Sequence, residues 1–250
     1  MLTLSVIIIT KDAEDDIRRC LESVKWADEI IVLDSGSRDN TVEICSEYTA
    51  NVFSTDWPGF GIQKNRALAK AQGEWILSID ADEVLSDALR DKIKQIVNNP
   101  KVRKEAYAIK RVSYFCEKKI NYGDWGHDNV VRLFRNQARI QFSPVIVHER
   151  LVGYSQLGYV KQVIFHHTIK NISQVLSKLE HYSTSGAQLA YQQHKKSSLF
   201  TAISHGLWCF IRGYFLRCGF LDGREGFIIA FSNALGVFYR YIKLIYLYKD

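Results

Sequence analysis

An apolar run that ends in closely spaced carboxylates is the feature that most restricts the fold of this chain. Residues 75–79 are apolar apart from one serine, and they lead directly into Asp80 and Asp82. Side chains two positions apart on an extended strand point to the same side. Both carboxylates would therefore face one point beyond the carboxyl end of a strand, where ligands bind in open α/β sheets.

Two carboxylates in this position suit a hard divalent cation. Mg²⁺ is commonly held by one or two carboxylates together with substrate phosphates. The alternative interpretation is an acidic turn between a strand and a helix, with Ser86 capping that helix. The rest of the sequence favours the metal site.

Strand and helix patterns alternate over the first hundred residues. A hydrophobic fraction of 47% is enough for a full core. Strands are predicted at residues 4–10, 29–34, 51–54 and 75–80, and helices at residues 39–48, 63–71 and 86–98, with a further helical face formed by Ile17, Cys20, Leu21 and Val24. This order predicts an α/β fold with a mostly parallel central sheet flanked by helices.

The pattern changes after Pro100. Residues 106–115 and 130–135 alternate like strands, and residues 138–142 are expected to pair with the second of these. Helical periodicity continues from residue 171 to the end. We therefore predict a catalytic domain over residues 1–168 and a helical C-terminal region over residues 169–250.

The last fifth of the chain is basic and aromatic. From Lys195 onward there are eight Lys or Arg and three Asp or Glu, against 25 and 24 in the rest, and 13 of the 31 aromatic residues fall there. This combination predicts contact with an anionic membrane surface. The uncharged runs at residues 197–211 and 226–239 are shorter than the ~18 to 20 residues that span a bilayer. The alternative is a helical subdomain with a solvated basic face.

Other features exclude several classes of protein. Five scattered cysteines without CxxC spacing argue against a disulfide framework or zinc site and fit a reducing compartment. The apolar N-terminus has no basic start and is interpreted as a buried strand, not a signal peptide. Aromatic residues of the tail recur at helical spacing beside aliphatic ones, which disfavours nucleic-acid binding.

The second strand ends at Asp34, which is followed by a small flexible loop. Such a loop forms a nucleotide pocket when it enters a helix, whose start favours anions. Neither GxGxxG nor GxxxxGK[ST] is present, which disfavours a dinucleotide site or a P-loop. The alternative is an ordinary polar loop in which Asp39 caps the helix.

Four motifs in this order resemble glycosyltransferase family 2. They are residues 5–10 (SVIIIT), 32–41 (VLDSGSRDNT), 64–67 (KNRA) and 80–83 (DADE). Residues 57–61 (WPGFG), 131–135 (VRLFR), 147–149 (VHE) and 219–223 (GFLDG) further resemble the bacterial lipopolysaccharide-core glucosyltransferases. The resemblance implies the GT-A nucleotide-diphospho-sugar transferase fold, a UDP-sugar donor and inversion at the anomeric centre.

The same resemblance implies roles for individual residues. Asp82 would bind a divalent metal, Mg²⁺ or Mn²⁺, and a histidine after the central strands, His167, would complete the metal shell. His166 and His167 are otherwise a structural pair. The nucleotide sugar would contact Thr10, Asp12, Asp34, Lys64, Arg66 and Asp80. The alternative for Lys64 and Arg66 is a pair of solvated helix cations.

Inversion requires a carboxylate that takes a proton from the acceptor hydroxyl. The family's acidic pair beyond the DxD motif is missing here, and two candidates remain, Asp128 and Glu149. Asp128 is slightly preferred. Arg132 or Arg135 would bind acceptor phosphate or donor diphosphate, and the other would be a surface cation.

The resemblance implies transfer of glucose from UDP-glucose to an inner-core heptose of lipopolysaccharide. The acceptor would be lipid-linked, and the protein would lie on the cytoplasmic face of the bacterial inner membrane. One alternative is a glycosyltransferase for another surface glycan, such as capsule or O-antigen. A second is a nucleotide-sugar-binding protein without catalysis.

Overall fold

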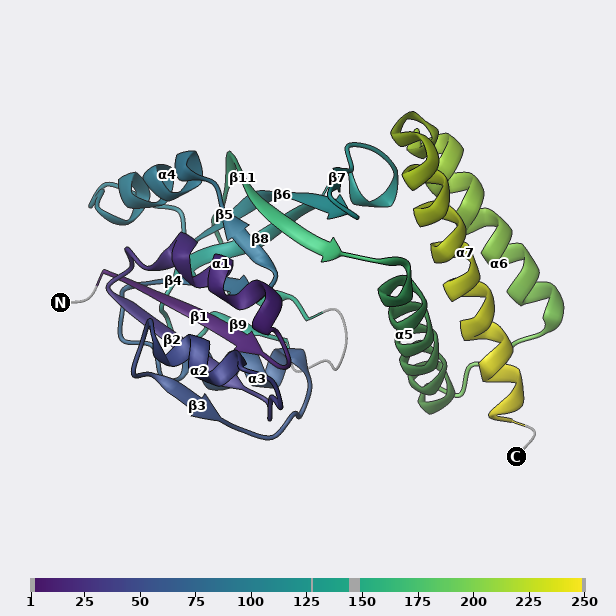
Figure 1. Cartoon of the computed structure of the whole chain (residues 1–250), viewed down its shortest axis with the longest axis horizontal. Coiled ribbons are helices and arrows are strands. Elements are labelled where there is room, and N and C mark those ends of the chain that lie inside the picture. Colours follow the sequence, from purple (N-terminus) through teal and green to yellow (C-terminus); the bar gives the residue numbers. More distant parts are fainter. Residues whose placement is uncertain (1–2, 127, 144–148, 249–250) are drawn as a thin grey trace. The chain divides into compact units, whose positions relative to one another are not determined.

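The computed structural model describes residues 3–126, 128–143 and 149–248 (Figure 1). It divides into two compact units, which are described separately. The first consists of Met1–Arg111 and Asn129–His166, and the second of Val112–Asp128 and His167–Asp250. The predicted boundary at residue 168 lies next to this division, but the second unit also contains a segment from the middle of the chain.

The main sheet is mixed, and its strand order is β3-β2-β1-β4-β8-β6-β11-β5, with β7 paired to β6. Strands β3, β2, β1 and β4 run parallel, whereas β8 is antiparallel to β4. The strands within the first unit are β1 (Leu4–Thr10), β2 (Glu29–Asp34), β3 (Val52–Ser54), β4 (Trp75–Asp80), β5 (Glu83–Leu85), β9 (Gln141–Phe142) and β10 (Leu151–Val152). Residues of three strands are divided between the units: β6 (Ala106–Phe115), β8 (Asp128–Arg135) and β11 (Leu157–Ile169).

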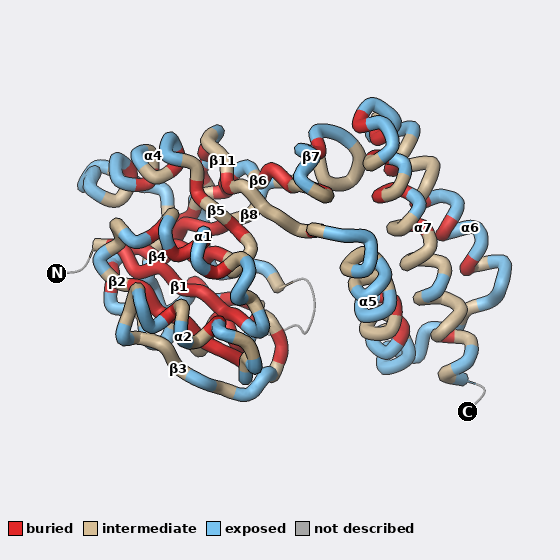
Figure 2. The backbone as a smooth tube through the Cα atoms, viewed as in Figure 1, coloured by how far each residue is buried: buried red, intermediate tan, exposed pale blue. Residues whose placement is uncertain are grey.

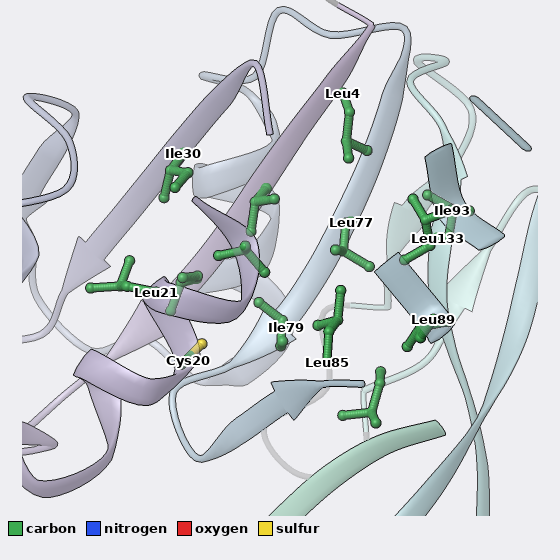
Figure 3. Packing of buried hydrophobic residues seen from close by; sticks show 14 of the residues in the cluster. Leu4, Cys20, Leu21, Ile30, Leu77, Ile79, Leu85, Leu89, Ile93 and Leu133 are labelled. Atoms are coloured by element: carbon green, nitrogen blue, oxygen red, sulfur yellow. The ribbon is translucent and has the colours of Figure 1, made fainter. Parts of the chain in front are cut away.

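Helices cover both faces of the parallel strands. They are α1 (Glu14–Val24), α2 (Thr41–Ser46), α3 (Phe60–Leu68) and α4 (Asp87–Val97). Alternate side chains of β1 enter two different clusters: Val6 and Ile8 pack with α1 and α4, and Ile7 and Ile9 pack with Ala67 of α3. Figure 3 shows the first cluster. Burial on both faces explains why these strands are continuous apolar runs.

The predicted strands at residues 4–10, 29–34, 75–80 and 106–115 have the observed bounds. The predicted pairing of residues 138–142 with the preceding strand is wrong. Strand β9 instead pairs with β10, because the two edges of β8 are already occupied by β4 and β6. A turn signal at residues 136–137 could not reveal this long-range partner.

The second unit is mainly helical. Its elements are β7 (Lys118–Lys119), the 3₁₀ turns η1 (Gly123–Trp125) and η3 (Gly219–Asp222), α5 (Ile172–Gln192), α6 (Leu199–Ile211), the π-helical turn η2 (Arg212–Leu216) and α7 (Gly223–Tyr246). A small core contains Phe115, Ile120, Ile169 and Ile229. Figure 2 shows strands β1, β2 and β4 largely buried, in contrast to the largely exposed helix α6.

The segment Gly219–Tyr246 has a mean hydropathy of 1.3 over an 18-residue window that is 17% buried. Within the described residues, it is long and apolar enough to cross a membrane by length and composition alone. The sequence-based expectation of a tail too short to cross considered only uncharged runs, whereas this segment includes the charged residues at both ends of α7.

Candidate active site

The register of the parallel strands brings the predicted site residues to one edge of the sheet. Thr10, at the end of β1, pairs with Asp34 at the end of β2. Ile9 pairs with Asp80 at the end of β4. Because all three strands are parallel, their carboxyl ends meet at this edge, as the sequence predicted.

Asp80 lies between two cations. Arg132 of β8 donates to Asp80 Oδ2, and Lys64 Nζ of α3 is 3.0 Å from Asp80 Oδ1. Burial by itself raises the pKa of the Asp80 carboxyl, but Arg132 and Lys64 outweigh it and hold that pKa well below its usual range. Asp80 is therefore ionised at neutral pH, with each oxygen facing a cation.

Glu83 is completely buried and contacts the backbone of Asp80. Its Oε1 accepts hydrogen bonds from Arg132 (2.6 Å) and Arg111 (3.3 Å), and its Oε2 accepts one from the Asp80 backbone N–H (3.0 Å). Sequence reasoning gave Glu83 no role. Its position in the acidic run DADE was the only available signal, because its arginine partners are far away in the chain.

Lys64 joins Asp80 to one of the two candidate bases. Its Nζ donates to Glu149 Oε1 at 2.7 Å, and only 4% of the Lys64 side chain is exposed. Asp128, the other candidate, is the first residue of β8 and belongs to the second unit. The remaining residues of the 147–149 motif, Val147 and His148, lie outside the described residues.

Asp82 is accompanied by a histidine from β11. His166 Nε2 is 3.1 Å from Asp82 Oδ2, and His166 is paired with Glu83 in the sheet. The predicted ligand His167 is the next residue of β11, and its ring instead stacks on Tyr114 with centroids 4.9 Å apart. The histidine beside Asp82 is thus His166, since adjacent residues of a strand point to opposite faces.

The loop after β2 is ordered by Asp34. Its Oδ2 accepts hydrogen bonds from the backbone N–H groups of Gly36 and Ser37, both at 2.9 Å, and its Oδ1 accepts one from the Ser37 hydroxyl. Asp12 fastens the same loop, because its Oδ1 accepts from the Arg38 N–H (2.8 Å). These two carboxylates hold the loop in shape, a role that the sequence-based prediction of direct nucleotide contact did not include.

Two buried polar atoms at this edge lack a hydrogen-bond partner among the described residues. They are the Thr10 hydroxyl oxygen and Arg132 Nε. A buried donor or acceptor without a partner costs about 1–3 kcal/mol. Both atoms are therefore suitable contacts for a bound polar molecule.

The other two predicted cations lie elsewhere. Arg66 of α3 donates to Asp56 Oδ1 at 2.6 Å, and both side chains are substantially exposed. Arg135 lies over the ring of Trp75, at the amino end of β4, with its guanidinium carbon 4.1 Å from the ring centroid. Of the pair on β8, only Arg132 lies at the site.

The residues present fit a divalent cation that completes its shell with substrate. Asp82 and His166 offer an oxygen and a nitrogen 3.1 Å apart, near the separation of about 3 Å expected for adjacent ligands in an octahedral shell with bonds of about 2.1 Å. The described residues contain no group of three or more His, Cys, Asp or Glu arranged to hold a metal. Phosphate oxygens and water would have to supply the other ligands.

The charged side chains at this edge of the sheet are four carboxylates and three cations. They are Asp80, Asp82, Glu83 and Glu149, and Lys64, Arg111 and Arg132. This arrangement can hold a metal–diphosphate and stabilise negative charge that develops on it. It also contains a carboxylate, Glu149, that can accept a proton.

Comparison with known proteins identifies the family. Residues 5–156 match the model of glycosyl transferase family 2. An uncharacterized glycosyltransferase of Rickettsia prowazekii (strain Madrid E) is 32% identical, with 98% of this chain and 87% of that protein covered. The lipopolysaccharide core biosynthesis glycosyltransferase LpsC of Rhizobium meliloti (strain 1021) is 28% identical, with 96% and 93% covered.

The fold is shared with a solved structure. The crystal structure of S. aureus TarS 1–349 superimposes with a TM-score of 0.50 at 14% identity, covering 98% of this chain and 91% of that one. The predicted family and GT-A fold are thus confirmed.

Proposed function

Because the chain belongs to glycosyltransferase family 2, we propose that it transfers glucose from UDP-glucose to an inner-core heptose of lipopolysaccharide, with inversion and with a divalent metal. The donor is inferred from the motifs shared with core glucosyltransferases. The acceptor is supported by the same motifs and by the similarity to LpsC, which is named for lipopolysaccharide core biosynthesis.

One observation carries this proposal: the charged cluster around Asp80 and Asp82 at the carboxyl edge of the sheet. A sugar nucleotide departs as a diphosphate, whose growing negative charge must be stabilised. Lys64 and Arg132 supply fixed positive charge at that point. When bound by Asp82 and His166, a divalent cation supplies Lewis-acid stabilisation.

The nucleotide is assigned to the adjoining loop. Asp34 and Asp12 keep the loop in the conformation that receives the base and ribose. The Thr10 hydroxyl offers a hydrogen bond that is otherwise unused within the described residues. Arg66 is assigned to the exposed periphery of the nucleotide site. It would contact the nucleotide only after breaking its ion pair with Asp56.

The base that removes the proton of the acceptor hydroxyl is assigned to a carboxylate. Glu149 is favoured by its link through Lys64 to Asp80, and Asp128 is the alternative. Substitution by the isosteric amide distinguishes them. The base variant, Glu149→Gln or Asp128→Asn, is expected to lose about 10²–10⁴-fold in kcat, and the other to keep most of it.

A lipid-linked acceptor places the reaction at a membrane. We assign the enzyme to the cytoplasmic face of the inner membrane as a peripheral protein, because the C-terminal region is basic and aromatic.

The test is a screen of UDP-sugars and other nucleotide sugars with the purified protein. The acceptors are lipopolysaccharide truncated at the inner core and, in separate reactions, capsule and O-antigen precursors. Transfer of glucose that stops on addition of EDTA and returns with Mg²⁺ or Mn²⁺ is expected. Transfer from another donor would overturn the donor assignment, and transfer in the presence of EDTA would overturn the proposed metal dependence. Transfer only to a capsule or O-antigen precursor would overturn the acceptor.

A further inference from the structure

Helix α6 buries small residues and exposes large apolar ones, the reverse of what is expected for a helix at a protein surface in water. Its buried positions are small: Ala202, Gly206 and Cys209. Its large apolar residues are exposed instead: Leu199, Phe200, Ile203, Leu207 and Trp208 are each between 51% and 80% accessible. A surface helix normally turns its large apolar residues inward.

The small residues allow a close approach between α6 and α7. A Cβ atom added to Gly206 would lie 3.3 Å from the carbonyl oxygen of Ala234 and 3.3 Å from Cβ of Phe238. Small residues between helices, with large apolar residues outside, are the arrangement of helices in lipid, where apolar side chains gain nothing by facing inward.

The apolar surface continues beyond α6 into an aromatic cluster. Phe210, Tyr214 and Phe227 contact one another, and Phe227 stacks on Phe231 with ring centroids 5.8 Å apart. Phe215, Phe227 and Phe231 remain about half exposed. Exposed apolar residues clustered in this way are typical of an interaction site.

Basic residues flank this patch. Lys195 and Lys196 precede α6 and are exposed, and Arg224 at the start of α7 is 85% exposed although it pairs with Glu225 at 2.9 Å. Apolar residues bordered by cations are typical of a surface that enters the headgroup region of an anionic membrane. A second copy of the same basic chain would bring like charges together.

We propose that the outer face of α6, with the adjoining aromatic cluster, is a docking surface for an anionic lipid bilayer. The surface is defined by Leu199, Phe200, Ile203, Leu207, Trp208, Phe215, Phe227 and Phe231. It lies in the membrane plane. Although Gly219–Tyr246 is long enough to cross a bilayer, the charged residues Glu225 and Arg240 limit its uncharged stretch to residues 226–239. That stretch is about 20 Å long at 1.5 Å per residue, less than the hydrocarbon thickness of ~30 Å.

This inference deepens the proposed function by naming the surface that would bring the site to a lipid-linked acceptor, but its test does not depend on the donor or acceptor. Sedimentation with vesicles is measured for the full chain, using phosphatidylcholine with and without phosphatidylglycerol. Binding that needs the anionic lipid and weakens with salt is expected.

The matched variants are Phe200→Glu and Tyr159→Glu. Phe200 is 80% exposed in the surface, and Tyr159 is 73% exposed on β11, so neither exchange disturbs a core. Phe200→Glu is expected to weaken vesicle binding about tenfold or more, because it replaces inserted apolar area by a charge, and Tyr159→Glu is expected to leave it unchanged. Circular dichroism checks that both fold.

Three results would overturn the proposal: wild-type protein that ignores anionic vesicles, Phe200→Glu that binds as wild type, or a stable dimer in solution that Phe200→Glu abolishes. The last would show that a second copy covers the surface. Transfer to a lipid-free core oligosaccharide tests the proposed function separately, and Phe200→Glu should leave it intact.

Discussion

Arg132 donates a 2.6 Å hydrogen bond to Glu83, and neither side chain is more than 7% exposed. The same guanidinium also bonds Asp80. One buried cation thus holds the carboxylate at the end of β4 and the one that begins β5. Glu83 in turn accepts a hydrogen bond from the backbone N–H of Asp80, which holds the turn that carries Asp82 in place.

Replacing Arg132 should therefore lower the free energy of unfolding. Arg132→Met leaves two carboxylates facing each other without their shared cation, and a loss of about 3–5 kcal/mol in the free energy of unfolding is expected. Arg135→Met, on the same strand, should cost about 1 kcal/mol or less, because Arg135 is partly exposed. Urea unfolding measures both, and equal losses would contradict the assigned importance of the buried pair.

The pKa of Asp80 predicts an acid-sensitive component of stability. That pKa is lowered in the folded protein, because Arg132 and Lys64 outweigh the effect of burial. A depressed carboxyl pKa contributes stability that is complete above the unfolded value near 3.9 and is lost as the pH falls below it.

The comparison is between wild type and Asp80→Asn in urea unfolding from pH 8 to pH 2. Wild type should lose stability more steeply below about pH 4, by up to about 1.4 kcal/mol per pH unit for one proton. Between pH 6 and 8 the two slopes should coincide, which is the internal control. Parallel slopes throughout would show that Asp80 does not titrate as described.

The two adjacent histidines should differ in their effect on metal use. His166→Ala is expected to raise the metal concentration for half-maximal transfer about 10–100-fold, because His166 lies beside Asp82. His167→Ala should leave that concentration unchanged, since His167 stacks on Tyr114. The measurement is activity against Mn²⁺ concentration, and the opposite ranking would return the ligand role to His167.

Order in the loop after β2 should control donor binding. Asp34→Ala removes the acceptor for three hydrogen bonds and should raise KM for the donor about tenfold or more, with a loss of stability of about 1–3 kcal/mol. Ser37→Ala keeps the carboxylate and its two backbone bonds, and a smaller rise in KM is expected. An unchanged KM in Asp34→Ala would separate the loop from the nucleotide.

Local pattern was enough to predict the scaffold. The strands ending at Thr10, Asp34 and Asp80 are apolar runs of the kind that helices cover on both faces, and their parallel order follows from the alternation with helices. The sequence alone therefore placed Asp80 and Asp82 at the edge of a sheet, and the family match at residues 5–156 agrees with the motifs found there.

Which side chains complete that edge was decided only by tertiary structure. Lys64 meets Glu149 across 85 positions of sequence, and whether His166 or His167 faces Asp82 depends on the register of β11 with β5. A shift of one residue in a strand would exchange the two histidines. The outward face of α6 was equally hidden, because helical periodicity identifies an apolar face but not what that face packs against.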